Sequence, residues 1–204
     1  MKGLLVLNGE KSDKLPDSSA YRYVVVTDGA YEKAKDELEK ITCVVGDFDS
    51  LGYIPKKVGV MKLDPEKDYT DGEVGLMYLV ERGCDEIDIC WALGGRLDHE
   101  LGNLTLLKIA KDNGATAKIV SENEEMYLVG GKFSLVGVLG KTISLLPFSL
   151  SAHIIDGEGF KYKVADRTLT KSETLGISNV ATKDEVSLDA DEGLLYVIVN
   201  KTER

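Results

Sequence analysis

Short apolar runs that alternate with helical patterns constrain the first 120 residues of this chain more than any other feature. The apolar runs are expected to be strands: residues 2–7, 23–26, 41–45, 59–63, 87–93 and 117–120. The segments with a helical pattern are residues 30–40, 71–82 and 98–112. Strands that alternate with helices in this way predict a mainly parallel sheet covered by helices on both faces.

The pattern changes after about residue 121, where the helical period disappears. Short apolar runs separated by Gly or Pro follow: residues 126–129, 133–138, 142–146, 153–155 and 159–164. Apolar and polar side chains then alternate over residues 186–190 and 195–199, a period typical of antiparallel strands. The sequence therefore predicts an α/β chain with a Rossmann-like, mainly parallel sheet domain over residues 1–121 and a small antiparallel β-sandwich domain over residues 122–204.

Charge and hydropathy exclude two classes of partner. A net charge of −10 argues against nucleic acid, because no basic excess is present to pair with phosphates. No apolar run approaches the ~20 residues that span a bilayer, so we expect no membrane partner and a cytoplasmic location. The three cysteines contain no C-x-x-C pair and are expected to be buried free thiols.

Acidic side chains gather at the ends of the expected strands, where ligands bind in open α/β sheets. Asp47 and Asp49 follow the strand at residues 41–45, and in an extended segment both would point to one side while Phe48 points to the other. The other acidic residues of this set are Asp28, Asp68, Asp71 and Asp98. Carboxylates at one edge would repel one another unless a cation bound there, and ligation by carboxylates alone suits Mg²⁺.

Glycines and cations at the same edge suit a phosphate group. A turn at Gly94 and Gly95 would let backbone N–H groups approach phosphate oxygens, while Lys67 and Arg96 supply positive charge. The combination predicts a magnesium–nucleotide site. It is not a Walker P-loop, because the sequence contains no G-x-x-x-x-G-K-[ST] motif.

Each of these groups, taken singly, also has a purely structural explanation. Asp28 could serve a turn, Thr70 or Asp71 could cap the following helix, and the two glycines could form a tight turn. The nucleotide-site interpretation rests on their combination at one edge of one sheet.

At these strand ends the sequence resembles the thiamine pyrophosphokinase family. Three blocks carry the resemblance in order: GDFDS at 46–50, KDYTDGE at 67–73 and GGRLDH at 94–99. Weaker matches are DGA at 28–30, GFKY at 159–162 and ISN at 177–179. The chain departs from the family pattern where a single Gly29 stands in place of a double glycine and where Val180 follows the Ser-Asn pair.

The resemblance implies that the diphosphate of ATP is transferred to the hydroxyl of thiamine, giving thiamine diphosphate and AMP. It implies Mg²⁺ held by Asp47, Asp49 and Asp71, and catalytic roles for Asp47, Asp71 and Asp98. The ATP-binding residues it implies are Asp28, Gly29, Asp49, Lys67, Asp68, Gly94, Gly95 and Arg96. Asp71 or Asp98 would take the hydroxyl proton.

The same resemblance implies a homodimer with its active site at the subunit interface. ATP and magnesium would bind residues 1–121, and thiamine would bind residues 122–204 through Ser178 and Asn179 of the partner subunit. Two alternatives stay open from the sequence. The acceptor could be another hydroxyalkyl heterocycle, such as a pterin alcohol, or the chain could be a non-catalytic regulator that binds nucleotide or thiamine.

Overall fold

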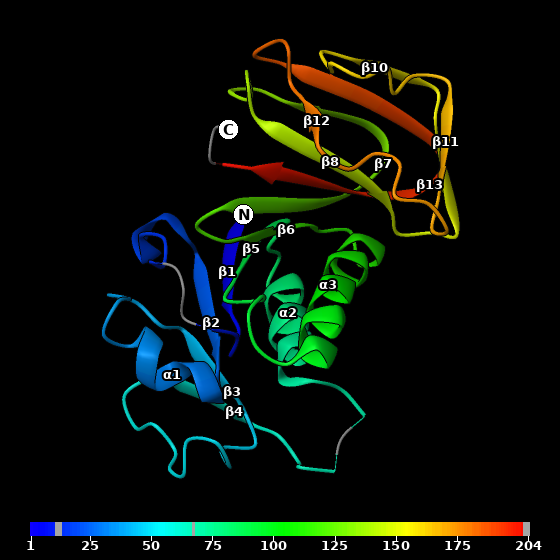
Figure 1. The fold of residues 1–204 in the computed structure, drawn as a ribbon. Helices are drawn as coiled ribbons and strands as arrows, with labels where there is room; N and C mark the ends of the chain where they lie inside the picture. The colour runs from blue at the N-terminus through cyan, green and yellow to red at the C-terminus, as the bar shows by residue number, and fades with distance from the viewer. Residues whose placement is uncertain (11–13, 67, 202–204) are drawn as a thin grey trace. The chain divides into compact units, whose positions relative to one another are not determined.

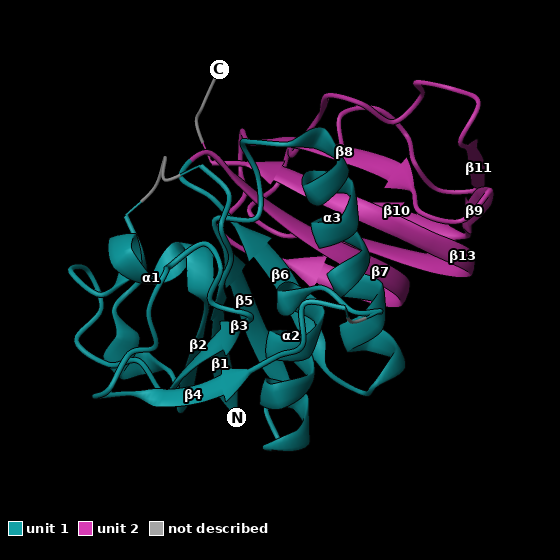
Figure 2. Ribbon diagram, turned by 90° about the horizontal axis from the view of Figure 1, so that it is seen from below, with its two compact units in different colours: residues 1–122 teal, residues 123–204 magenta. Residues whose placement is uncertain are grey.

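The computed structural model describes residues 1–10, 14–66 and 68–201 (Figure 1). Its contacts divide the chain into two compact units, Met1–Glu122 and Asn123–Arg204 (Figure 2). Strands pair in parallel in the first unit and antiparallel in the second, so the fold is a mixed α/β fold. Every helix among the described residues is too short or too polar to cross a membrane.

The first unit is a parallel sheet with helical connections. Its elements in chain order are β1 (Lys2–Val6), a 3-10 turn η1 (Ser18–Ala20), β2 (Tyr23–Thr27), α1 (Asp28–Ala34), β3 (Cys43–Gly46), β4 (Gly59–Lys62), α2 (Asp71–Glu81), β5 (Glu86–Cys90), α3 (Leu97–Asp112) and β6 (Thr116–Val120). The strand order is β4-β3-β2-β1-β5-β6. The direction of winding therefore reverses between β1 and β5, which is where open α/β sheets form a ligand crevice beyond the strand ends.

The inner strands β1, β2 and β3 are buried on both faces, which explains why they are continuous apolar runs rather than alternating ones. Leu4 of β1 belongs to a buried cluster on one face together with Ala30 and Ala34 of α1. On the other face α2 lies so close that a Cβ on Gly75 would be 2.8 Å from Cδ1 of Leu5. Helices α2 and α3 lie side by side (Figure 1). Each fully buried Leu or Val contributes about 1.5–3 kcal/mol relative to an exposed one.

The predicted elements of this unit are confirmed, with boundary shifts of three residues or more at two places. The first helix begins at Asp28 and ends at Ala34, so the expected helical residues 35–40 lie outside it. Strand β5 ends at Cys90 rather than at residue 93. The cause is Trp91, whose φ of 52° turns the chain out of the extended conformation.

The second unit consists of antiparallel strands around a separate apolar core. Its strands are β7 (Glu124–Leu135), β8 (Thr142–Pro147), β9 (Ser151–Ile154), β10 (Asp156–Glu158), β11 (Arg167–Thr170), β12 (Asn179–Val180) and β13 (Val186–Asn200). Strand β13 pairs with β7, β8 and β10, while β11 pairs with β9 and β12 with β8. The alternating residues Leu195, Val197 and Val199 of β13 face its core.

Three expectations for this unit were wrong in detail. Residues 159–164 do not form a strand; Gly159 has a φ of 83°, and only an isolated bridge joins Phe160 to Ala181. Residues 126–129 and 133–138 were expected as two strands, but β7 is continuous from 124 to 135. The irregularity lies in the partner strand β13, whose register with β7 shifts between Ala190 and Leu195. Strands β11 and β12 were not expected.

Candidate active site

A cavity of about 550 Å³ opens at the carboxyl ends of the strands of the first unit. Its walls come from the segments after β1, β2, β3 and β5 and from the N-terminal parts of α2 and α3. Six of the residues expected at a nucleotide site line it: Asp28, Asp71, Gly94, Gly95, Arg96 and Asp98. The strand order thus brings residues from distant parts of the sequence to one crevice.

Asp28 is the most buried carboxylate of this site, with 4% of its surface exposed. Its Oδ2 accepts the backbone N–H of Phe48 at 2.7 Å, and its Oδ1 accepts that of Gly29 at 2.6 Å. Burial raises the pKa of this carboxyl, the two N–H groups oppose that rise, and the charges of Asp71 and Asp47 add to it. Negative charge is therefore crowded around Asp28.

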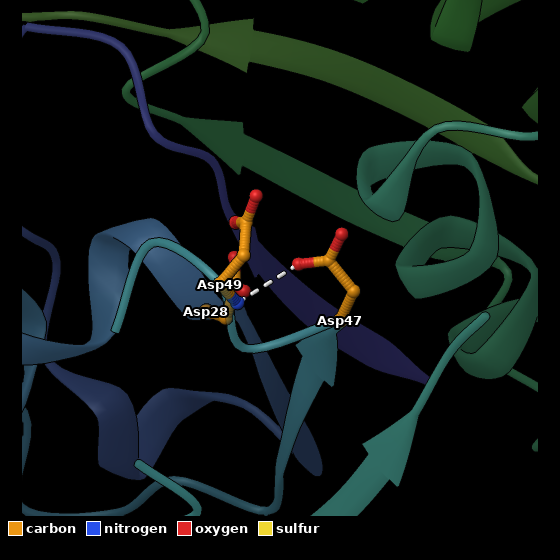
Figure 3. Close-up of side chains that lie close together, drawn as sticks. All are labelled: Asp28, Asp47 and Asp49. Atoms are coloured by element: carbon orange, nitrogen blue, oxygen red, sulfur yellow. Dashed lines mark hydrogen bonds between the residues drawn. The ribbon is translucent and has the colours of Figure 1, made fainter. Parts of the chain in front are cut away.

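Asp28, Asp47 and Asp49 each offer a carboxylate oxygen, and these oxygens lie within 4.8 Å of one another. Figure 3 shows the three side chains together at the end of β3, with the backbone N–H of Asp49 donating to Asp47 at 3.0 Å. Sequence reasoning placed Asp47 and Asp49 with Asp71 as metal ligands and assigned Asp28 to ATP. The structure brings Asp28 together with Asp47 and Asp49, and it places Asp71 on the wall of the cavity that Asp28 also lines. The role of Asp71 as a metal ligand stays a prediction.

The backbone between the two aspartates is not extended, contrary to the sequence prediction. Phe48 has a φ of 68°, and its carbonyl accepts the N–H of Gly52 at 3.0 Å, so the segment is a turn. A left-handed conformation is uncommon for a side chain this large, and the Asp28 bond to the Phe48 N–H holds it. The ring is nevertheless buried, as expected, with 6% of the residue exposed.

Asp71 is placed by the start of α2. Thr70 is the N-cap, and its hydroxyl accepts the N–H of Glu73 at 3.1 Å, which settles the capping role left open between Thr70 and Asp71. Asp71 therefore stands in the first turn, where a negative charge also complements the helix dipole. Its carboxylate remains a candidate group for the cavity.

Arg96 and Asp98 form an exposed pair at the start of α3. Nη2 of Arg96 lies 2.6 Å from Oδ2 of Asp98, and Nε lies 3.1 Å from Oδ1. This pairing raises the pKa of Arg96 and lowers that of Asp98. An exposed ion pair contributes little to stability, so a phosphate group can compete for the guanidinium.

The remaining residues of the predicted nucleotide site differ in their surroundings. Lys67 lies outside the described residues. Asp68 is exposed on the segment before α2. Gly29 is required by packing, because a Cβ there would lie 2.7 Å from Cγ of Asn8. Gly46 is required similarly, because its Cβ would lie 2.7 Å from both Cβ and Oδ2 of Asp28.

Sequence reasoning missed several residues that line the cavity. Asn8 and Gly9 follow β1, Thr27 ends β2, and Asn103 lies on α3. Asn8 and Gly9 carry the same signal as the other strand ends, a polar residue beside glycine after an apolar run. Asn103 has no such signal, because it lies seven residues beyond Arg96 inside the helix.

In the second unit, Asn179 is buried and makes two hydrogen bonds with the backbone of Tyr162. Its Nδ2 donates to the Tyr162 carbonyl at 2.8 Å, and its Oδ1 accepts the Tyr162 N–H at 3.0 Å. Ser178 has a φ of 61°, and its N–H donates to Oγ of Ser144 at 3.0 Å. The Asn179 amide thus positions the backbone of Tyr162. The contacts of Ser178 and Asn179 with thiamine stay predictions.

The residues present fit a magnesium ion. Carboxylate oxygens within 4.8 Å of one another are the hard ligands that Mg²⁺ prefers, and the crowding around Asp28 is the kind of repulsion that a divalent cation relieves. Asp28, Asp47 and Asp49 would hold the ion, with Asp71 nearby.

Two family models match the chain. The model described as "Thiamin pyrophosphokinase, catalytic domain" matches residues 17–119, and the model described as "Thiamin pyrophosphokinase, vitamin B1 binding domain" matches residues 129–195. The chain belongs to the thiamine pyrophosphokinase family. The reaction class inferred from the sequence, ATP-dependent diphosphate transfer, is confirmed by this membership.

Individual members of the family match over nearly their whole length. The thiamine pyrophosphokinase of Bacillus subtilis (strain 168) is 29% identical over 212 residues, which cover 97% of this chain and 98% of that protein. The crystal structure of a B. subtilis thiamine pyrophosphokinase gives a TM-score of 0.84 at 24% identity, covering 99% of this chain and 100% of the other. The structure from Geobacillus thermodenitrificans gives 0.81 at 25% identity, covering 99% and 98%. The fold is therefore that of the family.

Proposed function

We propose that this chain transfers the diphosphate of ATP to the hydroxyl of thiamine, releasing AMP and thiamine diphosphate. Membership of the family supports the reaction. The cluster of three carboxylates, Asp28, Asp47 and Asp49, supports the binding of magnesium that the reaction needs. The observation that carries the proposal is the convergence of Asp28, Asp47 and Asp49, of which Asp28 lines a cavity large enough for a nucleotide.

Within this proposal, residues 1–121 form the Rossmann-like domain that binds ATP and magnesium. When bound, Mg²⁺ supplies positive charge to the phosphate oxygens. Arg96 pairs with phosphate through the guanidinium nitrogens that bond Asp98 in the structure. The turn at Gly94 and Gly95 lets backbone N–H groups approach the phosphate oxygens. Positioning and electrostatics carry most of the rate enhancement in such transfers.

The acceptor hydroxyl must lose a proton when it attacks the β-phosphorus of ATP. Asp71 and Asp98 both line the cavity and are the candidates to take it. The hydrogen bond from Arg96 lowers the pKa of Asp98, which makes this carboxylate a weaker base than an unpaired one. We therefore assign the proton to Asp71.

Residues 122–204 form the β-sandwich domain that binds thiamine in this proposal. Ser178 and Asn179 contact thiamine in this proposal, and Asn179 also fixes the backbone of Tyr162. We further propose that the protein is a cytoplasmic homodimer in which the thiamine site of one subunit completes the ATP site of its partner.

Product identification tests the proposed reaction. Purified protein with ATP, MgCl₂ and thiamine should release AMP and thiamine diphosphate in equal amounts, and EDTA should abolish both. A panel of other alcohols, including a pterin alcohol, should give less than about a tenth of the thiamine rate. Faster transfer to any of them would assign a different acceptor to the same chemistry. Tight binding of ATP or thiamine without AMP release would favour a regulator.

A further inference from the structure

The turn that follows β5, residues 91–95, is held in an unusual backbone conformation. Trp91, Gly94 and Gly95 have φ values of 52°, 72° and 143°. Glycine adopts such values freely, but a buried tryptophan does so only where its surroundings enforce it. Ala92, Gly94 and Gly95 of this turn line the cavity, so its shape determines the surface that a phosphate group would meet.

Two hydrogen bonds from the segment after β1 hold this turn. The N–H of Gly9 donates to the Trp91 carbonyl at 2.8 Å, and the N–H of Glu10 donates to the Gly94 carbonyl at 2.5 Å. A Cβ on Gly9 would lie 2.6 Å from the carbonyl oxygen of Leu93, so this approach requires glycine. These contacts fix the two ends of the turn and leave Ala92 between them.

Asn103 makes a third hydrogen bond to this turn. It lies on α3, lines the cavity, and donates from Nδ2 to the Ala92 carbonyl at 2.8 Å. We propose that Asn103 is a positioning residue for ATP, which fixes the glycine turn through the Ala92 carbonyl. The inference rests on the proposed use of ATP at this cavity.

The physical reason is the orientation of one peptide group. A carbonyl oxygen at a phosphate site repels the ligand, whereas backbone N–H groups attract it. With its oxygen bonded to Asn103, the Ala92 peptide cannot rotate that oxygen toward the phosphate. Without the bond, the oxygen is left unpaired in a part-buried position, and the turn gains other conformations. Binding would then require the turn to be ordered again, which weakens affinity for ATP.

Helix α3 offers a matched control. Asn113 also donates from Nδ2 to a backbone carbonyl at 2.8 Å, that of Ile109, but it lies at the other end of the helix and outside the cavity lining. Asn103→Ala removes the bond at the turn, and Asn113→Ala removes its counterpart. Asn103→Asp keeps the side-chain volume but loses the Nδ2 donor and adds a charge, whereas Asn103→Ala loses both volume and donor without adding a charge. An effect shared by the two variants is therefore caused by the lost hydrogen bond.

Trp91 supplies a readout that needs no turnover, because it is the single tryptophan of the chain and stands in the turn. Its fluorescence emission should move to longer wavelength in both Asn103 variants and stay unchanged in Asn113→Ala. Titration with Mg·ATP, followed by calorimetry, should show about tenfold weaker binding in the Asn103 variants alone.

Steady-state kinetics separate positioning from a loss of folded protein. KM for ATP should rise about tenfold in the Asn103 variants, while KM for thiamine stays within twofold. A merely structural role would lower kcat and leave both KM values unchanged, and that result, or unchanged Trp91 emission and Mg·ATP affinity, would overturn the inference. Failure of the proposed function can be told apart from failure of this inference. If the proposed function is wrong, wild-type protein releases no AMP, but Trp91 emission and Mg·ATP titration still show whether Asn103 positions the turn.

Discussion

The Asp28 carboxylate accepts the backbone N–H of Phe48 at 2.7 Å and thereby joins the end of β2 to the turn after β3. Phe48 stands between Asp47 and Asp49, so this one bond fixes the turn that carries both aspartates. Asp28 therefore has two tasks in the account: it shapes the turn, and it completes the group of three carboxylates.

Asp71→Asn should reduce turnover by about 100-fold or more, because it removes a negative charge and the proposed base from the cavity. Glu81→Gln is the control, since Glu81 is the last, exposed residue of the same helix. Measured initial rates of AMP release should be normal in the control. Full activity of Asp71→Asn would remove Asp71 from the mechanism.

Gly46→Ala should raise the MgCl₂ concentration needed for half-maximal activity by about tenfold, because the new Cβ would displace the Asp28 carboxylate. Overpacking of this kind also costs about 1–3 kcal/mol of stability. Gly3→Ala is matched, since its Cβ would meet Sγ of Cys84 at 3.0 Å inside the same unit. Activity titrated against MgCl₂ should change only in Gly46→Ala, and an equal change in both would contradict a specific role.

Asn179→Ala should raise KM for thiamine without changing KM for ATP, because the Tyr162 backbone loses both of its bonds to the Asn179 amide. Leaving those groups unpaired also costs about 1–3 kcal/mol of unfolding free energy. Thr182→Ala is the control, since Thr182 donates to the Gly159 carbonyl at 3.0 Å from an exposed position. The account of Asn179 fails if both variants bind thiamine as wild type does.

His153 should make stability depend on pH. Its Nδ1 lies 2.6 Å from Asp191, its Nε2 lies 3.9 Å from Asp166, and Glu192 is also near. The hydrogen bond to Asp191 raises the pKa of His153, burial opposes that rise, and the acidic charges add to it.

The sign follows from the raised pKa. The folded state binds the proton more tightly, so the stabilisation is complete below about pH 6.5 and is lost as pH rises through the higher folded value. Unfolding temperatures measured between pH 5.5 and 8.5 should fall more in wild type than in Asp191→Asn. Parallel curves for the two proteins would show that the pair contributes nothing.

The architecture was largely predictable because the pattern of apolar residues is local. The runs that form β1, β2 and β3 are buried on both faces and carry their own signal. The failures occur where contacts distant in sequence decide the backbone. Strand β5 ends at the turn that begins with Trp91, and hydrogen bonds from Gly9 and Asn103 hold this turn. No pattern near residue 91 reveals these bonds.

The sequence predicted which strand ends form the candidate site, but not how the side chains there are arranged. Glycines and carboxylates after each strand identified the edge of the sheet, since parallel strands end together. Which carboxylates converge depends on a turn at Phe48 that the sequence suggested would be extended. The engagement of Asn179 with Tyr162, 17 residues earlier, was equally invisible in the sequence.

The most direct test of the central claim is the identity of the nucleotide product. ATP labelled in its β-phosphate should pass the label to thiamine diphosphate in the presence of MgCl₂, with AMP as the only nucleotide product. Release of ADP, or thiamine-independent hydrolysis with no labelled thiamine diphosphate, would contradict the account.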